Sequence, residues 1–219
     1  MKRMGLATGR TKRRRDRDMR RFAYPHRMQM LLCDGKRFRA GATRLKRVAL
    51  IYLDDATRRG LDALVGTEEE TEIFLTGVYG CIKKHGLFDA AFMDNGPGFI
   101  SDDTYSVFAQ GLKIPLINGT AGYPEGHGKI ERFNQSALAD MLRGLDGNPT
   151  VDPDCASLTL RFRHYLEHEY NARSHESLSG LSPHQRWDAD PRPLRFPESD
   201  AELRRCFVVT ETRTVSADN

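Results

Sequence analysis

The apolar positions of the first third of the chain mark three neighbouring strands joined by short links. Apolar residues gather in 28–33, 46–53 and 60–65, and the Asp-Asp-Ala-Thr-Arg turn at 54–58 joins the second run to the third. Short apolar runs separated by turn residues are typical of an antiparallel meander. We expect the first of these strands to end at Asp34.

A helix and two further strands are predicted next. Thr67 and the glutamate three residues later have the spacing of a capping box, and the helix that they begin ends at Gly86. Its apolar side carries Phe74, Val78, Cys81 and Ile82. Short apolar runs at 90–93 and 114–117 predict two more strands, with a helix capped by Ser101 between them.

The second half of the pattern is mainly helical. A glycine- and proline-containing loop at 120–128 precedes a long helix over 130–145, and a polar linker leads to a final helix over 158–169. A late strand is expected over 206–209. The order β-β-β-α-β-α-β-α-α predicts an α/β domain, in which a mixed five-stranded sheet is flanked by helices on both faces.

Composition narrows the class of protein. Hydrophobic residues make up 39% and charged residues 29%, a balance typical of globular domains. The longest apolar run, 48–53, is far shorter than the roughly 20 residues of a membrane helix, so we expect a cytoplasmic protein without a membrane partner. The four cysteines form no Cys-x-x-Cys pair, which favours reduced, packed thiols over a structural zinc site.

Positive charge is concentrated at the N-terminus. Residues 1–22 hold ten Lys or Arg and two Asp, including the run Arg13, Arg14 and Arg15, while the whole chain has a net charge of +4. We expect a disordered arm that attracts a polyanion such as DNA, because neutralised phosphates release counterions. A solubilising leader, a localisation signal and a translation-start artefact are the alternatives.

Three carboxylates stand where chemistry is possible. Asp34 and Asp94 follow predicted strands, and Glu131 lies in the first turn of the long helix. If they converge, they repel one another unless a divalent cation neutralises them, and hard oxygen ligands suit Mg²⁺ or Mn²⁺. Solvated turn residues are the alternative for each position. Asp54 and Asp55 also follow a strand, although their Thr-Arg turn is typical of a hairpin.

Several motifs resemble those of one family. The segment 93–99, Met-Asp-Asn-Gly-Pro-Gly-Phe, is similar to the signature of integrase cores, and 123–134 is similar to their Pro…Gly…Glu-Arg-aromatic-Asn segment. Thirty-six residues separate Asp94 from Glu131, close to the family's 35. The hairpin at 53–58 and the tail Tyr170-Asn171…His175…Leu178…Gly180…Pro183 also match. The chain therefore resembles the retroviral-integrase-like (DDE) transposases, particularly their Mu-type bacterial branch, over about 22–187.

The resemblance implies an RNase H-like fold with Asp34, Asp94 and Glu131 as catalytic and metal-binding residues. It implies two Mg²⁺ or Mn²⁺ ions, hydrolysis of a phosphodiester at a transposon end, and strand transfer into target DNA by a homo-oligomer. His127, Lys129 and Asn134, which flank Glu131, are the expected DNA contacts, with a solvated loop or a surface position as the alternative. His164 and His168 have metal-compatible spacing, but a solvated helix face is favoured.

Three segments and three functions follow. We expect a basic arm at 1–22, an integrase-like core at 23–190, and a linker with the start of a small β-barrel at 191–219. The main hypothesis is a metal-dependent polynucleotidyl transferase; the alternative is a non-catalytic DNA-binding relic or regulator, because the upstream DNA-recognition domains of full transposases find no counterpart in these 219 residues. A nuclease of the RNase H or resolvase type lacks support from the context of Glu131.

Overall fold

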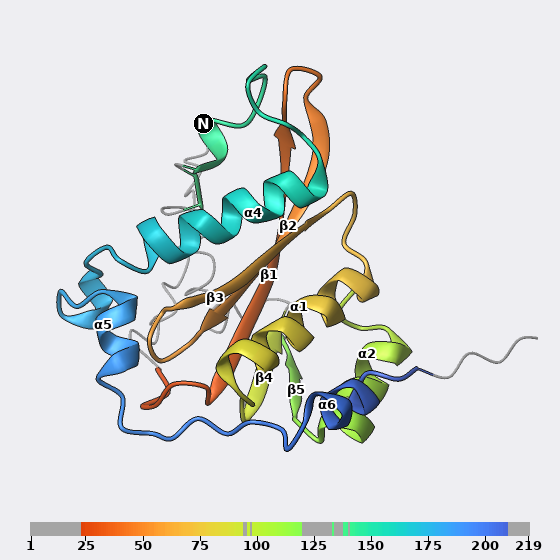
Figure 1. The fold of residues 1–219 in the computed structure, drawn as a ribbon, viewed down its shortest axis with the longest axis vertical. Helices are drawn as coiled ribbons and strands as arrows, with labels where there is room; N and C mark the ends of the chain where they lie inside the picture. The colour runs from red at the N-terminus through yellow and green to blue at the C-terminus, as the bar shows by residue number, and fades with distance from the viewer. Residues whose placement is uncertain are drawn as a thin grey trace, which may run out of the picture.

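The fold is that of a computed structural model, which describes residues 23–93, 96, 98–119, 133, 138–139 and 141–209 (Figure 1). The strands are β1 (Met30–Ala40), β2 (Leu45–Asp54), β3 (Gly60–Gly66), β4 (Ala90–Met93) and β5 (Leu116–Asn118). The helices are α1 (Thr71–His85), α2 (Asp102–Ser106), the π-helix η1 (Val107–Leu112), α4 (Cys155–His164), the π-helix η2 (Tyr165–Tyr170), the 3₁₀-helix η3 (Glu176–Leu178), α5 (Pro183–Asp188) and α6 (Asp200–Cys206).

The strands form one mixed sheet in the order β3-β2-β1-β4-β5. β1, β2 and β3 are antiparallel neighbours, whereas β4 is parallel to β1 and β5 is parallel to β4. The predicted mixed five-stranded sheet is therefore confirmed. The meander needs only short turns, and the parallel strands are each reached through a helical crossover.

β1 differs from its prediction at the point that matters most for function. The strand was expected to end at Asp34, but it continues to Ala40 and pairs with β2 over residues 31–40. Apolar alternation stops after Cys33, because the far half of β1 lies beyond the packed sheet and has no core to fill. β4 pairs only with 30–33 of β1, so Asp34 lies where β1 leaves its parallel neighbour.

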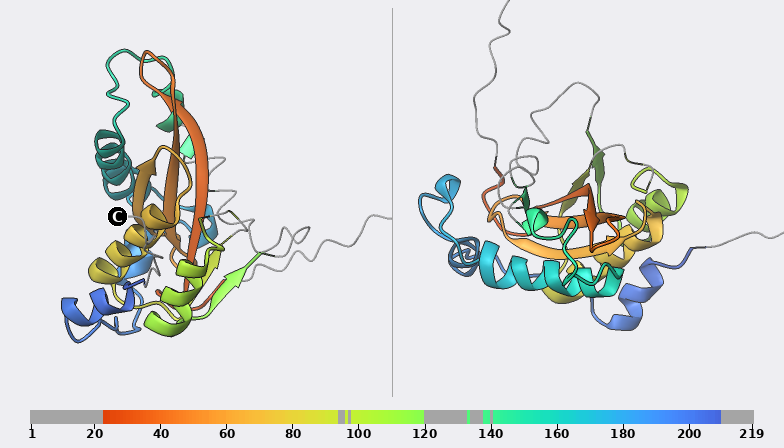
Figure 2. Two further views of the ribbon diagram at one scale, coloured as in Figure 1. Left: turned by 90° about the vertical axis from the view of Figure 1, so that its right-hand side faces the viewer. Right: turned by 90° about the horizontal axis from the view of Figure 1, so that it is seen from above.

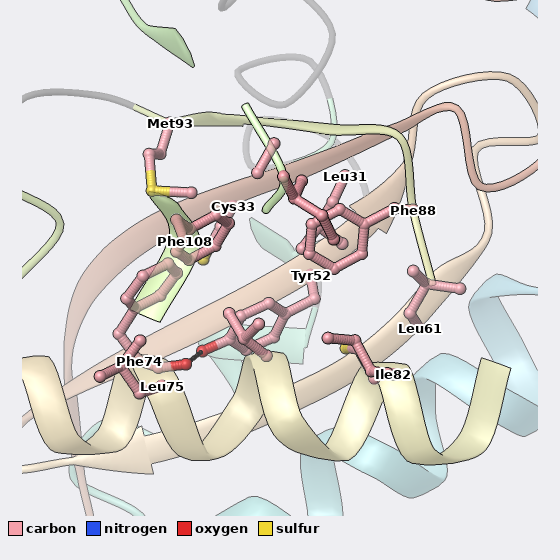
Figure 3. Close-up of a cluster of buried hydrophobic side chains, with 14 of the residues drawn as sticks. Leu31, Cys33, Tyr52, Leu61, Phe74, Leu75, Ile82, Phe88, Met93 and Phe108 are labelled. Carbon is pink, nitrogen blue, oxygen red and sulfur yellow. Dashed lines mark hydrogen bonds between the residues drawn. The ribbon is translucent and has the colours of Figure 1, made fainter. Parts of the chain in front are cut away.

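One face of the sheet packs against α1. Tyr52, Phe74, Phe88, Phe99 and Phe108 are fully buried in this cluster, and Figure 3 shows their rings between helix and strands. The Tyr52 hydroxyl donates a 2.9 Å hydrogen bond to the carbonyl of Phe74, which satisfies the one polar atom of a buried ring. Figure 2 shows from the side that α1 and α2 lie on this face. The predicted stripe of α1 is confirmed, and the helix ends at Gly86 with φ of 93°.

The edge of the sheet at β3 is covered by α4 and η2. Thr159 accepts a hydrogen bond from the backbone N–H of Val65, and Arg163 forms an ion pair with Asp62. Asn171 is fully buried and bonds both the N–H and the carbonyl of Gly60, as expected for a residue that fixes the helix end to the domain. These contacts occupy backbone groups that an open sheet edge would leave unpaired.

Two local predictions were wrong. The capping box at Thr67 is absent, because 67–70 form the link from β3 to α1, which begins at Thr71 with Glu70 at the N-cap. The strand expected over 206–209 is also absent, because α6 occupies 200–206. Ser199 caps α6 by accepting from the N–H of Glu202, and the side chains of Asp200 and Arg204 pair one turn apart.

No helix within the described part of the chain is long and apolar enough to cross a bilayer. Trp187 is buried, as predicted, and packs edge-to-face on His85 at 5.6 Å between ring centroids. His85 is itself only 5% exposed, and its Nε2 lies 3.0 Å from the carbonyl of Leu61. Burial lowers the pKa of His85 to about 4 from an ordinary value of 6.5.

This buried histidine predicts an acid-dependent loss of stability. The unfolded chain binds a proton near pH 6.5, whereas folded His85 binds one only near 4, so its contribution is present above 6.5 and is lost as the pH falls toward 4. Between pH 7.5 and 5 we expect it to lower the free energy of unfolding by about 2 kcal/mol. Urea denaturation of wild type and His85→Gln at both pH values tests this. The gap between the two proteins should narrow by that amount at pH 5, and a constant gap would contradict it.

Candidate active site

Asp34 is the predicted site residue that the structure describes. It is half-buried on β1, opposite Ile51 of β2. The preceding residue, Cys33, is the parallel partner of Met93, the last residue of β4. Asp34 therefore lies beside the carboxyl end of β4, where a parallel sheet opens and where ligands of α/β sheets bind.

The alternation of β1 fixes the face to which Asp34 belongs. Leu31 and Cys33 belong to the buried cluster on the α1 face, while Met30 and Leu32 belong to the cluster on the opposite face. Because successive side chains of a strand point to opposite faces, Asp34 falls on the face of Met30 and Leu32. It emerges where that cluster ends.

The helical segment predicted to carry Glu131 packs on the same face as Asp34. Phe133, Leu138 and Leu145 are all buried in the cluster that contains Met30 and Leu32. The Phe133 ring makes an edge-to-face contact with Tyr170 of η2, at 4.6 Å between centroids. The apolar stripe predicted for this segment is confirmed at the three positions named here.

The rival carboxylates of the hairpin turn have structural roles. Asp54 is 1% exposed and accepts hydrogen bonds from the backbone N–H groups of Met28 and Thr57 and from the Thr57 hydroxyl. Asp55 is 2% exposed, accepts from the N–H of Tyr24 and contacts Arg58. Burial raises the pKa of Asp54 to about 6, and its oxygens are taken up by the turn. The hairpin interpretation of this motif is confirmed.

Glu69 is a carboxylate near the site that sequence reasoning missed. A Cβ on Gly35 would lie 3.0 Å from Glu69 Oε1, and one on Gly98 would lie 3.0 Å from the Glu69 carbonyl oxygen. Glu69 thus bridges β1 and the turn that follows β4. It approaches from the α1 face, on the other side of the strand from Asp34, so it supports the backbone there. Only its place among three consecutive glutamates could have drawn attention to it.

The other predicted site residues lie outside the described residues: Asp94, Glu131, His127, Lys129, Asn134, Arg13, Arg14 and Arg15. Across the described ranges, no three His, Cys, Asp or Glu side chains are grouped as a metal site. His164 and His168 are exposed, with ring centroids 4.6 Å apart, as favoured for a solvated face. What can be tested for a metal is the donor chemistry: Asp34 offers hard carboxylate oxygens at an open sheet end, which suits Mg²⁺ or Mn²⁺.

Solved structures with the same fold are retroviral integrase cores. The chain aligns with a chain of the simian T-cell lymphotropic virus intasome in complex with the PP2A regulatory subunit B56 gamma, with a TM-score of 0.60 and 18% identity, over 87% of this chain and 63% of the other. It aligns with the HTLV-2 integrase catalytic core domain in complex with magnesium, with a TM-score of 0.53 and 17% identity, over 76% of this chain and 98% of that domain. The fold is therefore RNase H-like, as the sequence predicted.

A curated relative gives the same direction at the sequence level. The transposase for transposon Tn552 of Staphylococcus aureus is 28% identical over 140 residues, which cover 61% of this chain. The match spans only 29% of that transposase, so the chain is similar to a part of it. No protein-family model matches the sequence.

Proposed function

We propose that this chain is the catalytic core of a DNA transposase, which cleaves a phosphodiester and joins DNA strands with divalent metal ions. The observation that carries the proposal is the place of Asp34 on the sheet. Its strand neighbour Cys33 pairs with Met93, and Asp94 is the next residue of the chain after Met93. One further step of a parallel register corresponds to a strand spacing of about 4.8 Å.

The faces of the elements support a common site for all three carboxylates. Ala90 and Phe92 of β4 pack on the same face as Asp34, whereas Ala91 and Met93 pack on the α1 face. The next position in that alternation belongs to the face of Asp34. Glu131 precedes Phe133 by two residues, and Phe133 is buried on that face too.

In this proposal Asp34, Asp94 and Glu131 hold two Mg²⁺ or Mn²⁺ ions. When bound, such ions activate an attacking oxygen and stabilise a leaving one. The chain's own residues orient the phosphodiester: His127, Lys129 and Asn134 contact the DNA backbone next to Glu131, and Arg13, Arg14 and Arg15 add phosphate contacts from the arm.

The finer assignments rest on the same resemblance. We assign the chain to the Mu-type bacterial branch, with transposon ends and target DNA as its substrates, a homo-oligomer on DNA as its working form and the cytoplasm as its location. The proposed segments are the basic arm at 1–22, the core at 23–190, and 191–219 as the linker to a further domain. The name of the Tn552 relative and the integrase fold support DNA as the substrate.

The direct test is cleavage of plain duplex DNA. Purified protein incubated with supercoiled plasmid and Mn²⁺ should produce nicked circles, and the product should be absent with EDTA. Joining of a labelled duplex with a free 3′-hydroxyl into the plasmid tests strand transfer. Cleavage restricted to the RNA strand of an RNA–DNA hybrid would instead assign a nuclease of the RNase H type. Salt-sensitive DNA binding without metal-dependent product would leave a non-catalytic binder.

A further inference from the structure

The β1–β2 hairpin forms a basic arm that the proposed function has not used. Positions 35–53 contain six basic residues and no acidic one: Lys36, Arg37, Arg39, Arg44, Lys46 and Arg47. In the sheet, β3 pairs with β2 only from Val48 onward and β4 pairs with β1 only up to Cys33. The hairpin therefore extends past its neighbouring strands, as Figure 1 shows.

Two of the six basic residues hold the arm in place. Arg44 forms a bidentate pair with Asp146, at 2.8 and 2.7 Å, and Arg47 donates to the carbonyl of Pro153 at 2.8 Å. At the turn, the N–H of Gly41 bonds the carbonyl of Leu145 at 3.0 Å. The segment that follows the buried 133–145 stripe thus braces the hairpin.

The other four make no side-chain hydrogen bond or ion pair with any described residue. Lys36 is half-buried, Arg37 and Arg39 are exposed, and Lys46 is exposed opposite Arg39 in the β1–β2 register. Arg39 contributes only a longer-range attraction that, after Arg44, lowers the pKa of Asp146. The arm therefore presents an uncompensated positive charge.

The opposite end of the molecule shows the contrast. Lys83 and Arg204 both pair with Asp200, and Arg192 and Arg195 both pair with Asp89. There, basic side chains are neutralised within the fold. A basic strip left unpaired on a braced hairpin, with no acidic residue for 19 positions, fits a polyanion as its partner.

We propose that this arm binds the phosphate backbone of duplex DNA and guides it to Asp34. The inference rests on the proposed function for the choice of DNA. Asp34 lies on the same strand as the arm, six residues before Ala40. Six residues of strand span about 20 Å, which matches about six base pairs of duplex. The arm contacts DNA flanking the scissile phosphate and reads no sequence.

The test is the salt dependence of DNA binding, measured with a fluorescent duplex of about 20 base pairs in EDTA. The variant Arg37→Gln/Arg39→Gln/Lys46→Gln removes three phosphate contacts, so the slope of log Kd against log salt should become shallower by about 2.7. Between 50 and 200 mM salt, the affinity ratio of wild type to variant should change about 40-fold. All three side chains project from the hairpin beyond the packed sheet, and thermal unfolding verifies that the variant is folded.

Two matched variants make the result decisive. Lys83→Gln/Arg195→Gln/Arg204→Gln removes the same charge from the opposite end and should keep the wild-type slope. Arg37→Lys/Arg39→Lys/Lys46→Arg keeps the charge and should also keep it. An unchanged slope in the arm variant, an equal loss in the charge-matched control, or no DNA binding by the wild type would overturn the proposal. Arm-dependent binding without metal-dependent nicking would keep the arm and remove the proposed catalysis.

Discussion

Replacing Asp34 with asparagine is expected to lower the rate of Mn²⁺-dependent plasmid nicking by about 10³-fold or more. The change removes one anionic ligand and keeps the shape of the side chain. A loss of roughly 4 kcal/mol of transition-state stabilisation corresponds to this factor. Asp94→Asn should have an effect of the same size, because both carboxylates serve one site in our proposal. Initial nicking rates at saturating metal measure both.

Asp102→Asn is the matched control for these variants. Asp102 is an exposed carboxylate in the first turn of α2 that follows β4 by a few residues, as expected of a helix-terminus residue. Its loss should leave the nicking rate within about twofold, because it removes only a weak interaction with the helix dipole. Wild-type activity in Asp34→Asn would remove that residue from the site, and wild-type activity in Asp94→Asn would remove the catalytic proposal.

Gly77→Ala is expected to produce the largest loss of stability among single methyl additions to α1. A Cβ at Gly77 would lie 2.2 Å from the Tyr52 hydroxyl oxygen, inside the ring cluster of Figure 3. Tyr52 is fully buried and bonded to the Phe74 carbonyl, so it has no free space to enter. We expect a loss of about 3 kcal/mol and a fall in Tm of about 10 °C.

Gly80→Ala, on the same helix, separates this clash from the general effect of alanine. Its Cβ would meet only the Asp62 carboxylate, at 3.2 Å, and alanine favours a helix by about 1 kcal/mol over glycine. The two effects should nearly cancel. Differential scanning calorimetry of both variants tests the pair, and equal Tm shifts would contradict the close approach of α1 to Tyr52.

Patterns with a local physical cause predicted much of the fold. The apolar runs located β2, β3 and β4, and the 3.6-residue spacing identified the buried face of α1. The turn at Asp54 and Asp55 was interpreted correctly because a turn of this kind needs side-chain acceptors for its own N–H groups. These features depend on residues close together in the sequence.

Features set by distant contacts were missed. β1 runs past Asp34 because β2 provides backbone partners where no apolar alternation marks a strand. α1 begins four residues after Thr67 because 67–70 cross beside Gly35 and Gly98. The basic arm at 35–53 escaped notice beside the denser charge of 1–22, although the absence of acidic residues could have revealed it.

The candidate site was predictable as a resemblance more than as geometry. The spacing of Asp94 and Glu131 pointed to an integrase core, and the fold of the described residues agrees with it. Local sequence around Asp34 is a weak motif, and its assignment gains its support from the pairing of Cys33 with Met93. A parallel pair formed across 60 residues leaves no local pattern in the sequence.

The central claim is that three carboxylates gather around metal ions on one face of the sheet. A crystal structure of the protein soaked in Mn²⁺, with anomalous scattering to locate the ions, tests it most directly. The account predicts two manganese peaks about 3.5–4 Å apart, ligated by Asp34, Asp94 and Glu131. Carboxylates that point away from one another, or manganese bound elsewhere with none of the three as ligand, would contradict it.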